Sequence, residues 1–249
     1  MPRNTLEIVM GLWYNIFIYL WIREIGILRD QEVKNIMIGF YNYTVILTYI
    51  GLASAVTGIY FAFDKEMPLI LSVIALLLAG LCDMFDGKVA RTKKDRTTAE
   101  KKFGIQIDSL CDLICFGFLP GAIGYAVGMN RIYHYFILAF FTLAAVIRLA
   151  YFNVMEEERQ KKTKEVRREY EGLPVTSVAL IMPLLYSFRK NIESIGEGYF
   201  TEVYAIVMLA VGIAFITRFK VKKPKMKTML IFVGIGALEF LWLLYKDKF

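Results

Sequence analysis

Four aspartates lie close together between residues 83 and 112, and their types and spacing could do chemistry. Asp83 and Asp86 are three residues apart, and Asp108 and Asp112 are four apart, each pair within a largely apolar stretch. Residues three or four apart project from the same face of an α-helix. The spacing therefore predicts two helices that each present two carboxylates, and these two faces can converge into one acidic site.

Carboxylates within a membrane need a partner that offsets their loss of hydration. On insertion scales an aspartate at the centre of a membrane helix costs about 2.5 to 3.5 kcal/mol, and less near the interface. The chain has one histidine, His134, and its three cysteines show no metal-ligand spacing, so a zinc site and a disulfide framework are both excluded. Hard oxygen ligands favour Mg²⁺, Mn²⁺ or Ca²⁺. We therefore expect a hard divalent cation at the aspartates.

Two small residues and an arginine follow the first aspartate pair. Gly87 and Ala90 leave little side-chain bulk on the helix beside the carboxylates, so an extended ligand could approach the backbone there. Arg91 offers a planar fork for phosphate oxygens. Together with a bound metal, these residues favour a site for a pyrophosphate-containing substrate, whose oxygens are neutralised as one phosphate leaves.

The elements that must position these residues are long apolar segments. Hydrophobic residues make up 57% of the 249 residues, and apolar runs reach the roughly 20 residues that span a bilayer. A short apolar stretch at 8–22 indicates an extra interfacial segment, because it lacks the pattern of a signal peptide. We expect an all-α polytopic membrane helix bundle with helices at 43–63, 68–87, 105–127, 132–153, 173–188, 200–217 and 228–245.

Lysine and arginine, which give the chain a net charge of +7, lie mainly in alternate connections between these segments. The connections after the second, fourth and sixth segments are strongly basic, and by the positive-inside rule they face the cytoplasm. The aspartates are then expected on the cytoplasmic side of a multi-pass plasma-membrane protein. The basic loops suit anionic lipid headgroups, and the chain has no basic and aromatic stripe typical of nucleic-acid binding.

The stretch from the first aspartate to the last resembles the signature D-x-x-D-G-x-x-A-R…G-x-x-x-D-x-x-x-D of CDP-alcohol phosphotransferases. One departure is the spacer, because 12 residues separate Arg91 from Gly104, more than is usual in that family. The extra residues are polar, and they predict a larger cytoplasmic loop with the site intact. The matching positions are Asp83, Asp86, Gly87, Ala90, Arg91, Gly104, Asp108 and Asp112.

The resemblance implies a role for each of these positions. All four aspartates would bind Mg²⁺ or Mn²⁺, and Asp108 and Asp112 would be catalytic, with Asp112 either a further ligand or the general base on an acceptor hydroxyl. A weakly acidic hydroxyl needs such a base to attack at neutral pH. The positions that would contact the substrate are Gly87, Ala90, Arg91 and Gly104.

Three stretches, 103–121, 148–153 and 171–177, are similar to the phosphatidylserine synthase branch of this family. Ser109 stands where the branch that uses glycerol phosphate has proline, which also favours serine as the acceptor. Arg148 could pair with the carboxylate of serine or with a lipid phosphate, or it could simply extend its charge to the membrane interface.

The resemblance thus implies a homodimeric membrane enzyme, in contact with membrane lipids, that transfers a phosphatidyl group from CDP-diacylglycerol to L-serine in a polar, metal-containing cavity open to the cytoplasm. The alternatives are a sister transferase that uses glycerol 3-phosphate or inositol phosphate, and a cation transporter, although the chain shows no repeated acidic half. We expect an N-terminal segment at 1–36, the CDP-alcohol phosphotransferase domain at 37–220 with a six-helix core, and an additional C-terminal membrane helix at 221–249.

Overall fold

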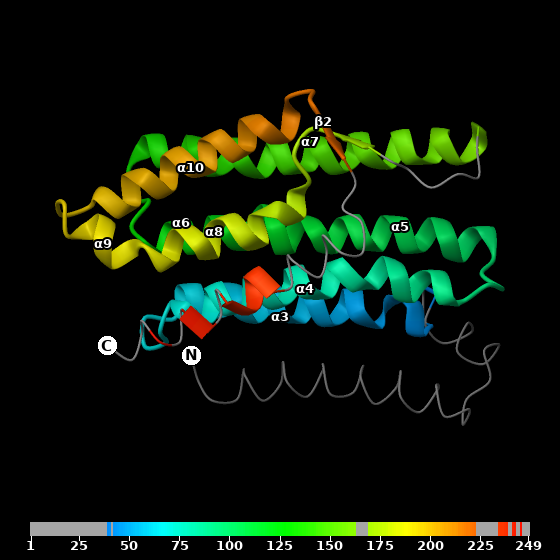
Figure 1. Cartoon of the computed structure of the whole chain (residues 1–249), viewed down its shortest axis with the longest axis horizontal. Helices are drawn as coiled ribbons and strands as arrows, with labels where there is room; N and C mark the ends of the chain where they lie inside the picture. Colours follow the sequence, from blue (N-terminus) through cyan, green and yellow to red (C-terminus); the bar gives the residue numbers. More distant parts are fainter. Residues whose placement is uncertain are drawn as a thin grey trace.

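The computed structural model describes residues 39–40, 42–162, 169–222, 234–238, 241–242 and 245. In these residues the chain forms a bundle of roughly parallel helices (Figure 1). The expectation of an all-α polytopic membrane bundle is confirmed, and the chain is a multi-pass membrane protein. Five described helices are long and apolar enough to cross a membrane: Tyr43–Phe63, Ile70–Thr92, Thr98–Ala126, Ile132–Arg159 and Tyr199–Ile216.

Several of the spans are composed of more than one helical element. A 3₁₀ turn leads into the first span, and a π-helical turn, η2, interrupts the third. The elements in order are η1 (Tyr43–Val45), α3 (Ile46–Phe63), α4 (Ile70–Thr92), α5 (Thr98–Asp112), η2 (Leu113–Phe118), α6 (Leu119–Ala126), α7 (Ile132–Lys162), β1 (Glu169–Glu171), η3 (Val175–Ser177), α8 (Val178–Ser187), α9 (Arg189–Glu193), α10 (Tyr199–Ile216) and β2 (Lys220–Lys222).

The helices near the aspartates are longer than the apolar pattern predicts. α4 continues to Thr92 instead of ending at 87, and α5 begins at Thr98 instead of 105. The early start of α5 has a local cause, because Thr97 and Glu100 form a capping box in which each side chain accepts a hydrogen bond from the other residue's backbone N–H. The apolar pattern marks only the part of each helix that lies in the membrane.

The predicted helix at 173–188 is present in a shorter form, η3 followed by α8. Its start is set by Gly172, which has φ +72° and at which a Cβ would lie 2.9 Å from the carbonyl oxygen of Thr217. Beside this turn, β1 pairs antiparallel with β2, a small pairing that the sequence did not predict. The predicted segment at 8–22 and most of 228–245 lie outside the described residues, although 234–238 are helical.

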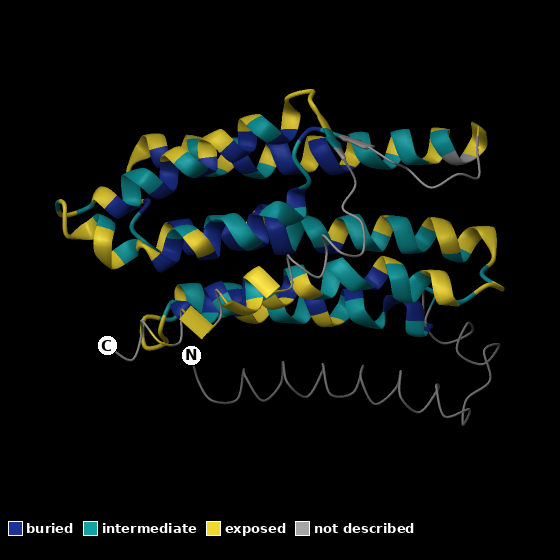
Figure 2. Cartoon of the chain, viewed as in Figure 1, coloured by how far each residue is buried: buried dark blue, intermediate teal, exposed yellow. Residues whose placement is uncertain are grey.

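The helices pack in pairs around one buried interior. α3 packs on α4, α7 packs on α10, and α8 lies against α4 (Figure 1). Buried residues line the contacts between these helices, whereas exposed residues lie on the outer faces (Figure 2). The outer faces include many large apolar side chains, as expected where a helix meets lipid. The largest fully buried side chains include Tyr204, Phe116, Phe141, Phe215 and Leu76.

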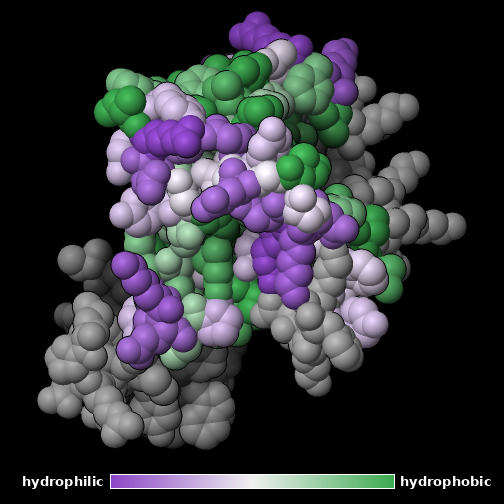
Figure 3. All heavy atoms as spheres, turned by 90° about the vertical axis from the view of Figure 1, so that its left-hand side faces the viewer, coloured by the Kyte–Doolittle hydropathy of each residue, from purple (hydrophilic) through white to green (hydrophobic). Residues whose placement is uncertain are grey.

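One end of the bundle, formed by the connections between α3 and α4, α6 and α7, and α8 and α10, carries hydrophilic side chains (Figure 3). There Arg131 Nη1 lies 3.1 Å from Glu202 Oε1, and the hydroxyl of Tyr133 donates to the same oxygen at 2.7 Å. His134 Nε2 lies 3.5 Å from Glu202 Oε2. These contacts join the starts of α7 and α10 at the end opposite the α4–α5 connection, so the one histidine takes no part in the acidic site.

Close packing of α3 on α4 depends on a glycine. A Cβ on Gly58 would lie 2.7 Å from Ala75 Cβ and 3.1 Å from Leu119 Cδ1, too close for any real contact. We expect Gly58→Ala to lower the free energy of unfolding by about 1 to 3 kcal/mol, the range typical of overpacking. The measurement is the thermal unfolding midpoint in detergent, with Gly121→Ala as control, because a Cβ there meets only Leu138 Cδ2 at 3.7 Å. Equal midpoints for the two variants would contradict this packing.

Candidate functional site

The four aspartates converge where α4 and α5 lie side by side. Asp83, Asp108 and Asp112 each place one carboxylate oxygen within 4.8 Å of the others. Asp86 is the fourth member, because its carboxyl group interacts electrostatically with those of Asp83 and Asp108. The structure therefore brings together the two pairs whose spacing suggested a common site.

The cluster is partly shielded from solvent, and the positive charge of Arg91 acts on Asp86 without forming an ion pair. Asp86 is 7% exposed, and the other three are partly buried. Among the described residues, none of the four forms an ion pair with a lysine, arginine or histidine. Carboxylates this close disfavour one another's charged form unless a cation lies between them. The donors are all carboxylate oxygens, a set that fits a hard divalent ion.

Thr48 on α3 adds a contact that the sequence did not reveal. Its Oγ1 donates a hydrogen bond of 3.2 Å to Asp86 Oδ2, and the residue is buried. The bond orients the carboxylate of Asp86 from the side of α3, while Asp108 lies on the side of α5. Thr48 is one of two threonines in this apolar helix and carries no sequence signal of its own, because only the packing of α3 on α4 brings it to the aspartate.

The small residues near the aspartates have different surroundings. Of the described residues, a Cβ on Gly87 would meet only Arg91 Nη1, at 4.0 Å, so these residues leave open space beside the cluster at this point. A Cβ on Gly104 would instead collide with the guanidinium group of Arg96. The carbonyl oxygen of Ala90 accepts a hydrogen bond of 3.4 Å from the same guanidinium group. Gly87 therefore borders space for a ligand, whereas Ala90 and Gly104 border a side chain of the protein.

Arg148 lies in the interior of the protein. It is 6% exposed, its Nε donates a hydrogen bond of 3.2 Å to the carbonyl oxygen of Leu173, and its guanidinium carbon lies 5.9 Å from the centre of the Phe152 ring. An arginine that extends its charge to the membrane interface would be exposed at its tip, so this burial argues against that alternative. Arg148 instead joins α7 to the turn before α8.

Two further hydrogen bonds connect the stretches that were singled out in the sequence. Ser109 Oγ donates to Asn153 Oδ1 at 2.9 Å, which joins α5 to α7. The hydroxyl of Tyr151 donates to Glu171 Oε2 at 2.8 Å, which joins α7 to β1. The stretches 103–121, 148–153 and 171–177 therefore meet in space.

The cysteines take no visible part in the site. Cys111 and Cys115 are buried in the packing of the third span, and Cys82 is partly buried on α4. All three are free thiols. Cys111 and Cys115 therefore belong to the apolar packing of the bundle.

Comparison with known proteins gives the family. The profile of the CDP-alcohol phosphatidyltransferases matches residues 41–218. Relatives include the CDP-diacylglycerol–serine O-phosphatidyltransferases of Saccharomyces cerevisiae (33% identical, over 64% of this chain and 58% of the relative) and Helicobacter pylori strain 26695 (29%, over 70% and 68%). The archaetidylserine synthase of Methanothermobacter thermautotrophicus is 27% identical, over 69% of this chain and 66% of its own length.

No solved structure matches the chain. The alignments span 58% of the yeast relative and 55% of that from Mycobacterium bovis, so the chain covers less than two thirds of the length of these relatives. The profile match nevertheless extends over most of the chain and includes α3 to α10 with all four aspartates. The chain belongs to the CDP-alcohol phosphatidyltransferase family.

Proposed function

We propose that the protein transfers the phosphatidyl group of CDP-diacylglycerol to L-serine, giving phosphatidylserine and CMP. The observation that carries this proposal is the convergence of Asp83, Asp86, Asp108 and Asp112, which form no ion pair within the described part of the chain, next to the open space at Gly87. Serine is favoured as the acceptor because the relatives from yeast and Helicobacter pylori are named as serine transferases.

The four aspartates would hold Mg²⁺ or Mn²⁺, which when bound supplies neutralisation of the pyrophosphate charge. The serine oxygen attacks the phosphorus that carries the diacylglycerol, and the bond from that phosphorus to the oxygen of CMP breaks. A carboxylate must take the hydroxyl proton during this attack. Asp112 is proposed as this base, as the resemblance to the family implies, while Asp86 already accepts a hydrogen bond from Thr48.

The nucleotide would occupy the open space beside Gly87. The absence of a side chain there lets cytidine and ribose approach the backbone of α4, and the exposed Arg91 lies at the edge of the same space, where it can meet a phosphate. Ala90 and Gly104 would then act on the substrate through the shape of the helices, since both lie beside the side chain of Arg96.

Arg148 is proposed to attract the carboxylate of serine. It places a positive charge in the interior of the bundle, on the same helix as Asn153, which in turn contacts Ser109 next to Asp108. The basic connection between α4 and α5 would face the cytoplasm. That orientation, a location in the plasma membrane and a homodimer follow from the charge pattern and the resemblance, and they stay predictions.

The primary test is release of CMP from CDP-diacylglycerol by the purified protein with Mg²⁺ or Mn²⁺. We expect release to require L-serine, and Asp108→Asn to lower it by about a hundredfold or more, the scale of a lost acid–base group or ligand. Asp95→Asn, an exposed change in the α4–α5 connection, is the control. Release with glycerol 3-phosphate or inositol phosphate would indicate a sister transferase. No release with any acceptor, from folded protein, would refute the transferase and leave cation transport to be tested.

Thr48→Val tests the orientation of Asp86. The substitution keeps the shape of the side chain and removes the hydrogen bond to the carboxylate. Hydrogen bonds to charged groups contribute about 1.5 to 3 kcal/mol, so we expect kcat/KM for CDP-diacylglycerol to fall by about tenfold or more. Thr57→Val on the same helix is the matched control, because its hydroxyl bonds only to the carbonyl oxygen of Ala53 and is exposed. Equal values of kcat/KM for both variants would show that Thr48 does not orient Asp86 for catalysis.

Arg148→Gln tests the acceptor site. We expect KM for L-serine to rise by about tenfold, because a charge-assisted contact to a carboxylate is lost, with KM for CDP-diacylglycerol unchanged. Arg148→Lys retains the charge, so its KM for L-serine should lie between that of Arg148→Gln and that of the original protein. A rise in KM for the lipid alone would instead assign Arg148 to the donor.

A further inference from the structure

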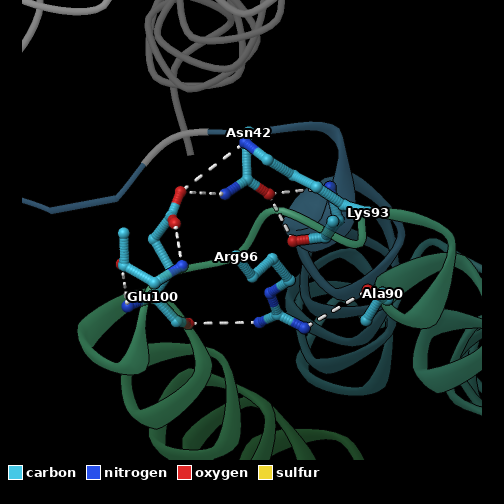
Figure 4. A network of polar contacts seen from close by, with 7 residues as sticks. Asn42, Ala90, Lys93, Arg96 and Glu100 are labelled. Atoms are coloured by element: carbon cyan, nitrogen blue, oxygen red, sulfur yellow. Dashed lines mark hydrogen bonds and ion pairs between the residues drawn. The ribbon is translucent and has the colours of Figure 1, made fainter.

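Arg96 lies in the connection that is longer than usual in the family, and its guanidinium group bridges the two helices that carry the aspartates. Nη1 donates to the carbonyl oxygen of Ala90 on α4 at 3.4 Å, and Nη2 donates to the carbonyl oxygen of Glu100 on α5 at 3.1 Å (Figure 4). Its Nε is buried without a hydrogen-bond partner among the described residues. The side chain is therefore enclosed between the helices.

Each acceptor is placed for such a bridge by helix geometry. α4 ends at Thr92, so the carbonyl of Ala90 is among the last four, which have no partner within the helix. A cation at this end also interacts favourably with the helix dipole. On α5 the carbonyl of Glu100 points toward Gly104, four residues on, so a donor that reaches this oxygen must lie over Gly104. The missing Cβ of that glycine leaves the room that the guanidinium group fills.

The bridge stands one helical turn from the place where the aspartates meet. Ala90 follows Asp86 by four residues, and Gly104 precedes Asp108 by four, so each pair shares a helix face at a distance of about 6 Å along the axis. Asp86 on α4 and Asp108 on α5 belong to the same carboxylate cluster and interact electrostatically across the two helices. The separation of the two helices at Arg96 thus sets their separation at the aspartates.

A second set of contacts holds this connection in place. Glu100 Oε1 accepts a hydrogen bond of 3.2 Å from Asn42 Nδ2 and lies 3.6 Å from Lys93 Nζ (Figure 4). Its other oxygen accepts from the backbone N–H of Thr97 at 2.7 Å. The residue that gives Arg96 a backbone acceptor is therefore fixed by its own side chain to the starts of α3 and α5.

We propose that Arg96 is a positioning residue of the aspartate site. By joining Ala90 to Glu100 it fixes the distance between α4 and α5, and through that distance the spacing of the carboxylates that would bind the divalent ion. This inference rests on the metal site of the proposed function. The longer connection between α4 and α5 then helps to build the metal site, whereas the sequence predicted only a larger loop.

The test is binding of Mn²⁺ alone to the purified protein, followed by the electron paramagnetic resonance signal of free Mn²⁺. We expect Arg96→Ala to weaken binding by about tenfold, the lower end of the effect of residues that orient metal ligands. Arg96→Lys keeps the charge without the two-pronged bridge, and it should restore part of the affinity. Thermal unfolding midpoints near that of the original protein would show that both variants are folded.

Lys94→Ala is the matched control, because it removes the same charge from an exposed position of the same connection. Loss of a positive charge near an acidic cluster by itself favours cation binding, so Lys94→Ala should leave Mn²⁺ binding unchanged or slightly tighter. Unchanged or tighter binding by Arg96→Ala would overturn the proposal. Normal Mn²⁺ binding with a raised KM for CDP-diacylglycerol would also overturn it, because Arg96 would then contact the substrate. No Mn²⁺ binding by the original protein would instead refute the metal site itself.

Gly104→Ala gives an independent measurement with the arginine retained. Its Cβ would displace the guanidinium group, so we expect a similar loss of Mn²⁺ affinity. If both residues act through the same bridge, Arg96→Ala combined with Gly104→Ala should bind no more weakly than Arg96→Ala alone. Losses that add fully in the double variant would show that the two residues act separately and would contradict the proposal.

Discussion

Electrostatic repulsion among Asp83, Asp86, Asp108 and Asp112 is the constraint on which the rest of this structure depends. Charges a few ångströms apart interact far more strongly in a protein interior than in water, and taking them out of water adds a further cost. A bundle that held them loosely would let them separate toward solvent. The helices must therefore hold the aspartates together, and contacts from several neighbouring elements keep α4 and α5 in place.

Those contacts come from three neighbouring elements. α3 supplies the hydroxyl of Thr48, and it can approach because Gly58 lets its backbone lie close to Ala75 on α4. From the other side, Gly80 on α4 lies directly against Ala179 on α8. Small residues at such crossings let helix backbones pack closely in membranes, where the hydrophobic effect does not drive helices together. α4 is thus held between two helices, and its acidic face is fixed toward α5.

The sequence predicted the acidic site more completely than its surroundings, for physical reasons. Spacings of three and four residues determine which side chains share a helix face, so the two aspartate pairs could be identified without knowledge of the fold. The bridging role of Arg96 depends on the distance between two helices, which no spacing within one helix specifies. Thr48 carries no such mark, because only the packing of α3 on α4 brings its hydroxyl to Asp86. The extension of α4 and α5 beyond the apolar pattern follows from capping and polar helix formers, which hydropathy does not register.

The π-helical turn η2, directly after Asp112, changes how the third span can be used. An α-helix advances by about 100° per residue, so an uninterrupted helix would place Leu119, seven residues after Asp112, on nearly the same face. The wider turn takes up an extra residue and rotates everything after it, and Leu119 is fully buried in the apolar core. The span is therefore continuous but changes the face that it presents: before η2 it presents Asp108 and Asp112 to the acidic site, and after η2 it presents Leu119 and Ile123 to the apolar core. Because the helix face rotates at η2, a single membrane span can contribute both to the polar site and to the apolar packing of the bundle.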